Sequence, residues 1–426
     1  MKLHSLPIVV TLCFCLAWQG CEDDNINPGP FTFPIDLQAS TASSNVSLTW
    51  TQATVSSFEE YIVIRSIDPI PDTPEPEVTG NQVIIERVDE ADENSLIDFA
   101  TPIVETVYYK VYADVGDRYL MSQTVQAQQD LQLIDYRVDV VEPDPDRNEL
   151  IGFDRSFDVL FVYDYENKEV KTQRTWSLNN PILRHGSFNG TDEVYVIDQN
   201  QSTLYVFRRS DLTLLKQYST GSIVSDFFFS NGLFFIALSN GTIEVRNRSN
   251  YSRLSDRFGA ASGTRVLHKT EENGGNVKFV EVAFNAVVNF MWNGSSIQQL
   301  ESRIDIGGSS QLFTAFHPEH TEMIINNAGR VLAADLGDIG TLGSGLQFHN
   351  AMTYSDDGEV VATVGFVGNT NQLLFYSVEQ GYPEIMSNEL SFTPVKMWGD
   401  NGKIYACTVV FSNGGVRSVI NMYDLP

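Results

Sequence analysis

A six-residue apolar pattern recurs seven times between residues 159 and 423 of this chain. The recurring segments are VLFVYD (159–164), TLYVFR (203–208), TIEVRN (242–247), VVNFMW (287–292), RVLAAD (330–335), QLLFYS (372–377) and SVINMY (418–423). Their starts lie 44, 39, 45, 43, 42 and 46 residues apart, and the alternation within them is typical of strands. Repetition at such a spacing indicates one supersecondary unit that is stacked many times.

Each repeat is preceded by a second apolar strand, and most of these strands follow a tight-turn sequence. The preceding strands are 150–153, 193–198, 233–238, 277–282, 322–327, 359–364 and 403–408, and the turns include SFNGTDE (187–193), FSNG (229–232), FHPEHTE (316–322), YSDDGE (354–359) and WGDNGK (398–403). Asn-Gly and Asp-Gly supply the positive φ that two-residue hairpins need. Seven units of about 43 residues, with four strands each, predict a closed β-propeller. The outer strand missing from the last unit is expected from residues 128–136.

The turns and spacing, particularly AMTYSDDGEVVATVGF (351–366), resemble the seven-bladed WD40-like and YVTN-type propellers. The resemblance implies a propeller over residues 130–426. It also implies that partners meet the face formed by loops entering the innermost strands and by loops between second and third strands. Residues of recognition character expected on that face are Trp176, Arg184, His185, Arg265, His349 and Trp398. Aromatic rings can stack on sugars and arginine can clamp carboxylates, whereas packing or plain exposure is the alternative for each.

Short alternating strands without a helical period also fill residues 31–129. Trp50 and the segment TVYYKVYADVGD (106–117) resemble the B and F strands of a fibronectin type III domain, and Leu96-Ile97-Asp98 resembles its E strand. The resemblance implies a β-sandwich with Trp50 in its core and a hydroxyl of Tyr108 or Tyr109 bonded back to the backbone. The proline-rich loop 68–79 is expected to be exposed. Such a module is expected to act as a spacer.

Residues 1–20 have the short polar start and the ten-residue apolar stretch of a signal peptide. Gly20 precedes Cys21, and an acidic run, Glu22-Asp23-Asp24, follows it. This arrangement resembles a bacterial lipoprotein signal of the Bacteroidota surface-export type. The resemblance implies that Cys21 carries lipid, that residues 21–30 form a spacer, and that the protein is anchored in the outer membrane facing the cell surface.

The chain is strongly acidic, with 55 Asp and Glu against 27 Lys and Arg and a formal charge of −28. Such a field repels phosphate backbones and anionic membrane surfaces, which excludes a nucleic-acid-binding role. Residues 22–130 hold 20 acidic against 4 basic residues, so the first domain has the denser charge.

No catalytic or metal-binding motif stands out in the sequence. G-x-S-x-G, H-E-x-x-H, the Walker loop and C-x-x-C are absent, and the run Asp144–Asn148 lacks the later ligands of an EF-hand. His317-Pro318-Glu319-His320 falls at a hairpin-turn position and is interpreted as exposed turn residues. Cys407 lies in an apolar strand and is expected to pack as a small hydrophobe. No cofactor, metal or catalytic residue is therefore predicted.

The leading hypothesis is a non-enzymatic, lipid-anchored outer-membrane protein whose propeller binds a protein partner. The partner is expected in a transport or assembly complex of the same membrane. The alternative is a surface glycan-binding protein or a propeller-type polysaccharide lyase or glycosidase, because scattered His, Tyr, Arg and carboxylates in such enzymes leave no local motif.

Overall fold

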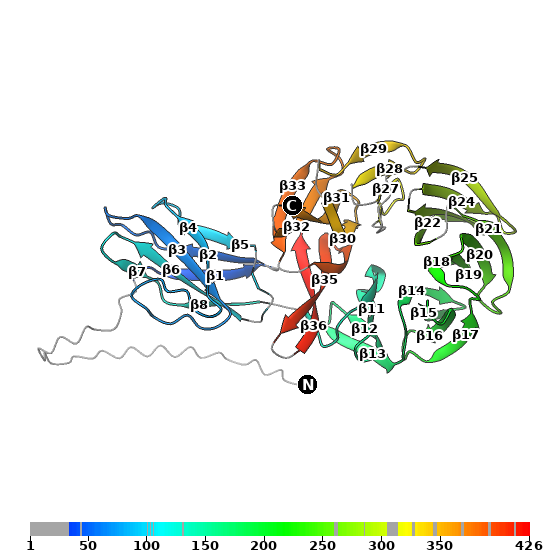
Figure 1. Ribbon diagram of the computed structural model, residues 1–426, viewed down its shortest axis with the longest axis horizontal. Helices are drawn as coiled ribbons and strands as arrows, with labels where there is room; N and C mark the ends of the chain where they lie inside the picture. Colours follow the sequence, from blue (N-terminus) through cyan, green and yellow to red (C-terminus); the bar gives the residue numbers. More distant parts are fainter. Residues whose placement is uncertain are drawn as a thin grey trace, which may run out of the picture.

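The chain folds as an all-β protein with a two-sheet sandwich followed by a ring of sheets (Figure 1). The computed structural model describes residues 34–42, 45–99, 101–102, 104, 106–129, 132–259, 263–284, 286–304, 314–325, 329–343, 347–367, 370–390, 393–412 and 415–426. Within these residues the helical structure is one short 3-10 turn, η1 (Pro145–Arg147). No helix in this part of the chain is long and apolar enough to cross a membrane.

The sandwich is built from eight strands in two sheets. One sheet has the order β1 (Leu37–Ala42), β2 (Asn45–Trp50), β5 (Ser95–Asp98); the other has the order β4 (Val83–Val88), β3 (Glu60–Ser66), β6 (Thr106–Asp114), β7 (Tyr119–Met121), with β8 (Val125–Gln128) also paired to β6. Both sheets contribute to one apolar core, in which Trp50 is 3% exposed and meets the ring of Tyr61 edge-on. The predicted core position of Trp50 is confirmed.

The expected backbone bond of a tyrosine on β6 is not found at Tyr109. Its hydroxyl donates instead to Oδ2 of Asp98 at 2.8 Å, and Arg65 pairs with the same carboxylate at 2.9 Å. Asp98 is buried, and a buried carboxylate without hydrogen-bond donors costs more free energy than a buried backbone carbonyl without one. The Tyr109 hydroxyl therefore donates to Asp98. The hydroxyl that does bond to backbone belongs to Tyr61, which accepts from the Ala53 N–H at 2.7 Å and donates to the Ala91 carbonyl at 3.2 Å.

The proline-rich loop 68–79 contains no strand, as predicted, but it is anchored to the sandwich. Ile70 is buried in a small apolar cluster on the outer side of β3 and β6. The fully buried Lys110 donates to the Pro71 carbonyl at 3.1 Å and pairs with Asp72 at 2.5 Å. The expectation of an exposed loop is therefore wrong at this end, because the lysine needs these oxygens to be buried with its charge.

The described part of the ring contains seven four-stranded antiparallel sheets, numbered first to seventh in chain order. They are β10 (Val140–Asp144), β11 (Glu149–Asp154), β12 (Val159–Asp164), β13 (Glu169–Thr175); β14 (Pro181–Phe188), β15 (Thr191–Asp198), β16 (Thr203–Arg208), β17 (Leu214–Ser219); β18 (Val224–Ser230), β19 (Leu233–Leu238), β20 (Thr242–Asn247), β21 (Arg253–Phe258); β22 (Arg265–Asn273), β23 (Asn276–Ala283), β24 (Ala286–Trp292), β25 (Ile297–Ile304); β26 (Thr314–Phe316), β27 (Glu322–Ile325), β28 (Arg330–Ala333), β29 (Asp338–Thr341); β30 (Gln347–Tyr354), β31 (Val360–Val367), β32 (Thr370–Ser377), β33 (Glu384–Leu390); and β34 (Pro394–Asp400), β35 (Lys403–Ser412), β36 (Gly415–Asp424) with β9 (Gln132–Ile134). The first strands β14, β18, β22 and β30 lie toward the centre of the ring (Figure 1).

The seventh sheet combines the two ends of the ring. β9, which follows the sandwich, pairs antiparallel with β36 near the C-terminus, and the Val138 N–H donates to Oγ of Ser418 at 2.8 Å. The predicted outer strand from residues 128–136 is confirmed. Apolar side chains of the seventh and first sheets then share one core cluster, which closes the ring.

The hairpin turns adopt the geometry that their sequences predict. Asn189, Asn231 and Asn401 have φ of 50°, 51° and 50°, and the glycine after each also has positive φ. The predicted repeat at 330–335 is wrong in register, because β28 ends at Ala333 and the two residues after it belong to a turn. A displacement of two residues keeps every side chain on its face of the strand, so alternation alone does not detect it.

Each pair of neighbouring sheets packs through its own apolar cluster, and the contact is called a junction. Among the described residues, six junctions have ten to twelve buried apolar side chains. The junction between the fourth and fifth sheets has seven, and none of these seven is aromatic. Among the described residues, this junction therefore has the smallest cluster of buried apolar side chains.

Candidate functional site

Of the predicted recognition residues, Arg184 lies on the innermost strand β14 and connects three sheets. Its guanidinium pairs with Glu142 on β10 at 3.2 Å and with Asp226 on β18 at 2.6 Å, and its Nε donates to the Phe227 carbonyl at 3.0 Å. Burial acts to lower the pKa of Arg184, but the carboxylates of Asp226 and Glu142 outweigh it and raise the pKa. These contacts hold the centre of the ring together.

Trp176, Arg265 and Trp398 serve packing between sheets. Arg265 is 1% exposed and fully enclosed, with Glu281 and the carbonyls of the third sheet as partners. Trp398 is 4% exposed and stacks on Tyr405 at 5.5 Å. The structure thus removes Arg265 and Trp398 from any exposed recognition surface.

Trp176 is partly buried between the first and second sheets, where it meets the rings of Tyr205 and Phe207 edge-on and lies under Arg174. Its contacts are those of a junction residue, so packing accounts for it.

His185 is partly exposed on β14, with its Nδ1 3.3 Å from the Asp144 carboxylate. His349 lies in β30, where its backbone pairs with Val364 of β31; its side chain lies outside the described residues, as does Cys21. The structure therefore does not bring the six predicted residues into one site.

His317 and His320 lie in the turn between β26 and β27, as predicted, but His317 is not exposed. Its ring is buried beside Tyr354 of the sixth sheet, and its Nδ1 accepts from the Glu319 N–H at 3.1 Å. The expectation of an exposed residue is therefore wrong for His317, because the neighbouring sheet covers it. Within the described residues, no group of three or more His, Cys, Asp or Glu side chains is placed to hold a metal ion.

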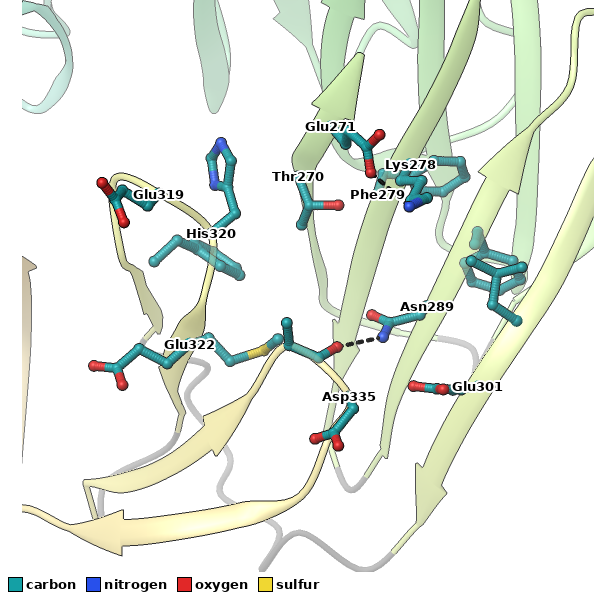
Figure 2. A pocket seen from close by; sticks show the side chains of 15 residues that line it. Thr270, Glu271, Lys278, Phe279, Asn289, Glu301, Glu319, His320, Glu322 and Asp335 are labelled. Carbon is teal, nitrogen blue, oxygen red and sulfur yellow. Dashed lines mark hydrogen bonds and ion pairs between the residues drawn. The ribbon is translucent and has the colours of Figure 1, made fainter. Parts of the chain in front are cut away.

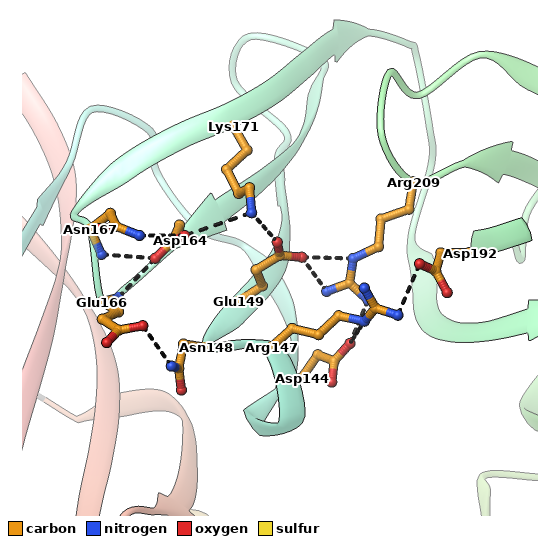
Figure 3. A network of polar contacts seen from close by, with 10 residues as sticks. All are labelled: Asp144, Arg147, Asn148, Glu149, Asp164, Glu166, Asn167, Lys171, Asp192 and Arg209. Carbon is orange, nitrogen blue, oxygen red and sulfur yellow. Dashed lines mark hydrogen bonds and ion pairs between the residues drawn. The ribbon is translucent and has the colours of Figure 1, made fainter.

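An arginine from the turn after β16 bridges the first–second junction (Figure 3), beside a cavity of about 500 Å³ that it helps to line. Nε of Arg209 donates to Glu149 at 2.7 Å, and the same guanidinium pairs with Asp144. Lys171 adds a second ion pair to Glu149 at 2.7 Å, and Glu149 in turn raises the pKa of Lys171. Arg209, Asp144 and Glu149 are each at most 8% exposed in their side chains, so this is a buried charge network.

The second–third junction repeats the arrangement. Arg248, from the turn after β20, pairs with Glu193 at 2.6 Å and lies over the ring of Phe188 at 5.1 Å. The two arginines occupy equivalent positions, because each backbone N–H donates at 2.9 Å to a carbonyl at the start of the second strand of its sheet: Asp192 near the beginning of β15, and Gly232 just before β19.

At the fourth–fifth junction the equivalent position is Ala334. Its N–H donates to the Thr321 carbonyl at 2.8 Å, which matches the bonds of Arg209 and Arg248. A cavity of about 460 Å³ lies beside it, between the fourth and fifth sheets (Figure 2). We call this cavity the junction groove.

Apolar side chains form one part of the junction groove and carboxylates the other. The apolar lining residues include Phe279, Phe290, Leu300, Phe316 and Met323; the acidic ones are Glu271, Glu301, Glu319, Glu322 and Asp335. Glu271 pairs with Lys278 at 2.5 Å, and the amide of Asn289 donates to the Ala334 carbonyl at 2.9 Å (Figure 2). Turns between first and second strands and between third and fourth strands surround it. The junction groove thus lies on the face opposite to the predicted one.

A histidine pair lies at the inner side of the junction groove. Nε2 of His268 on β22 is 3.3 Å from Nδ1 of His320, and the His268 ring stacks on Phe316 at 3.8 Å. Burial, followed by the His320 ring, lowers the pKa of His268 to about 3, and burial also lowers the pKa of His320. Both rings are therefore neutral at pH 7.

Comparison with known proteins identifies the fold. No protein-family model matches the chain, and no curated protein matches it. Among solved structures, the β-propeller domain of Cps50 (Swd1) from Myceliophteria thermophila is 14% identical with a TM-score of 0.52, covering 69% of this chain and 98% of that one. The C-terminal WD40 domain of Sif2 is 13% identical with a TM-score of 0.51, covering 77% and 94%. Sqt1 from Saccharomyces cerevisiae is 12% identical with a TM-score of 0.51, covering 69% and 98%. These similarities show that the ring of sheets has the β-propeller fold of WD40 domains.

Proposed function

We propose that this protein is a non-enzymatic binding protein whose propeller presents the junction groove to a protein partner. The observation that carries the proposal is the groove itself. Its volume lies in the range of about 300–1,000 Å³ that ligand sites have, and its lining includes the exposed Leu300, the partly buried Phe316 and several carboxylates. Rigid sheets hold both walls, as a recognition surface requires.

The same proposal includes the setting that the sequence indicates. A lipid on Cys21 would anchor the chain at the outer membrane, and the sandwich, as a fibronectin type III-like spacer, would lift a ring of seven blades from the surface. Support comes from the signal-like residues 1–20, the two-sheet sandwich and the pairing of β9 with β36. This pairing, which joins the two ends of the ring, is called the clasp. The partner would belong to a transport or assembly complex of the same membrane.

Purification of the native protein in mild detergent, followed by mass spectrometry, tests this function. We expect one membrane protein to co-purify at a fixed ratio, and Cys21→Ser to release the protein from the membrane fraction. If no protein co-purifies and the propeller is retarded in polysaccharide affinity gels, the protein-binding function is wrong and the glycan-binding alternative replaces it.

A further inference from the structure

We propose that the face of the propeller opposite to the junction groove binds an apolar, uncharged surface of a partner protein. This face is formed by the turns between second and third strands and by the loops that lead from one sheet to the next, and we call it the loop face. Both kinds of connection lie at the same end of the sheets, because consecutive strands in each sheet are antiparallel. The inference goes beyond the proposed function, because it adds a second surface whose chemistry differs from that of the groove. The residues that carry it are not among the six that the sequence predicted.

Beyond the first sheet, the described part of the loop face has no charged residue in its loops. Four of these loops are WSLNN (176–180), QNQS (199–202), TGSI (220–223) and SNG (239–241), and the described residues of the next two are Gly259, Gly263, Thr264 and Phe284. Arg155 and Asp158, beside Phe157 on the first sheet, mark the border of this region. By contrast, the turns at the opposite ends of the first three sheets include Glu166, Lys168, Arg209, Asp211 and Arg248. A chain with a formal charge of −28 therefore has one region from which charge is absent.

The same face has the four most exposed large apolar side chains of the described residues. Phe258 and Phe157 are 67% and 65% exposed, and Ile223 and Phe284 are each 53% exposed. Phe157 and Phe284 lie in turns between second and third strands, Phe258 ends β21, and Ile223 lies just before β18. They therefore follow the loop face from the first to the fourth sheet. Absence of charge together with exposed aromatic rings is the composition found at the centre of protein–protein interfaces.

The Phe258 ring is supported by the turn beneath it. A Cβ on Gly241 would lie 2.8 Å from this ring, and Gly241 has a φ of 97°, which glycine adopts readily. The Gly259 N–H donates to the Gly241 carbonyl at 2.7 Å, and the buried Arg265 donates to the same carbonyl at 3.1 Å. One side of the ring thus packs on a fixed turn while the ring remains mostly exposed. Binding against such a ring costs little additional conformational entropy.

An apolar protein surface is the occupant that fits the loop face. A charged group would lose its hydration there and find no opposite charge to pair with. The four apolar side chains extend over the ends of several sheets, which is wider than a sugar ring, and Ile223 has no flat face to stack on one. Exposed amides in the same loops, including Asn179, Asn200 and Asn240, supply the polar rim that protein interfaces have.

The direct test uses hexapeptide pools on immobilised full-length protein. One pool has leucine fixed at the third and fourth positions, with uncharged residues randomised at the others; matched pools have serine or glutamate at the fixed positions. We expect the leucine pool to be retained about tenfold above the serine pool, and the excess to persist as salt rises, because salt does not screen apolar contacts. Equal retention of the leucine and serine pools overturns the inference, and so does preference for the glutamate pool. Retention on neutral polysaccharide or on phosphatidylcholine vesicles without a preference among the peptide pools overturns the choice of a protein as the occupant.

The variant that tests the location combines Phe258→Ser with Phe284→Ser. We expect it to lower retention of the leucine pool about tenfold. The matched control combines Leu254→Ser with Ile339→Ser, which removes exposed apolar side chains from the outer strands β21 and β29, and is expected to retain the pool like wild type. Unchanged retention in the phenylalanine variant, or an equal loss in the control, overturns the inference. If thermal unfolding shows that the phenylalanine variant is not folded, Ile223→Asp adds a charge to the loop face at an exposed position and is expected to lower retention as well.

Capture from native membranes separates this inference from the proposed function. If wild type captures no protein, the proposed function fails, and the peptide pools still decide on the loop face. If wild type and the phenylalanine variant capture the same protein equally, the proposed function stands and the inference is wrong. Loss of the captured protein in the phenylalanine variant but not in the control, with a photoreactive phenylalanine at position 258 that cross-links to an apolar segment of that protein, supports both.

Discussion

The first–second and fourth–fifth junctions share one scaffold and differ in what fills it. In the first, Arg209 and Arg147 pair with Asp144 and Asp192 across the two sheets, and Lys171 pairs with Glu149 within the first sheet. In the second, Ala334 leaves a cavity and a smaller apolar cluster, with carboxylates around it. Both junctions have a cavity, of about 500 Å³ and about 460 Å³ respectively, and they differ in whether an arginine or an alanine stands beside it after the third strand.

The largest effect is expected from removing the buried arginine of the first–second junction. Arg209→Met would leave Asp144 and Glu149 buried with fewer partners, and removal of one member of such a network costs about 3 kcal/mol. Urea unfolding measures the loss. Arg208→Met is the matched control, because Arg208 and its partner Asp211 are exposed and such pairs contribute about 0–1 kcal/mol. Equal effects of the two variants would contradict the distinction between the junctions.

The second prediction concerns the loss of folding stability in acid. The folded-state pKa of His268 is about 3, against an ordinary value of 6.5, so between these values the unfolded chain binds more protons than the folded one. Stability contributed by the neutral ring is therefore present above pH 6.5 and is lost as the pH falls. The nearby charged groups, Arg184, Lys269 and Lys396, are all cationic and oppose protonation further.

The measurement is the free energy of unfolding between pH 7 and pH 4 in wild type and in His268→Phe. The phenylalanine keeps a ring against Phe316 and does not titrate, so its stability is expected to fall less steeply with acid. Parallel curves for the two proteins would show that the histidine pair does not make the fourth–fifth junction acid-sensitive.

The smallest effect is expected at the edge of the junction groove. Lys278 and Glu271 are 47% and 48% exposed in their side chains, so Lys278→Ala is expected to change the free energy of unfolding by less than about 0.5 kcal/mol. Urea unfolding measures the change, and a loss above about 1 kcal/mol would contradict the small contribution expected of an exposed pair.

The fold was accessible from the sequence because seven similar units repeat one pattern. The repeat spacing, the turn residues and the missing outer strand were enough to predict the ring and its clasp. The candidate binding site could not be predicted from the sequence in the same way. Arg265 and Trp398 have the composition of recognition residues, yet the structure uses them to fill junctions, and sequence alone does not distinguish these roles.

The junction groove was missed for a specific reason. The predicted repeat at 330–335 included Ala334 in a strand, two residues beyond its end at Ala333, so the residue was never aligned with Arg209 and Arg248. Alternation has a period of two and tolerates this displacement. Aligning the units by their turns would have placed an alanine opposite two arginines and marked this junction as different.

The clasp has a mechanical consequence. β9 follows directly on the last strand of the sandwich, and only three residues of it pair with β36. A pull on the chain from its N-terminal side therefore reaches the propeller at this short strand before it reaches any other. The three-residue ladder therefore carries such a load first, and the apolar cluster between the seventh and first sheets would still hold the ring together after the ladder separates.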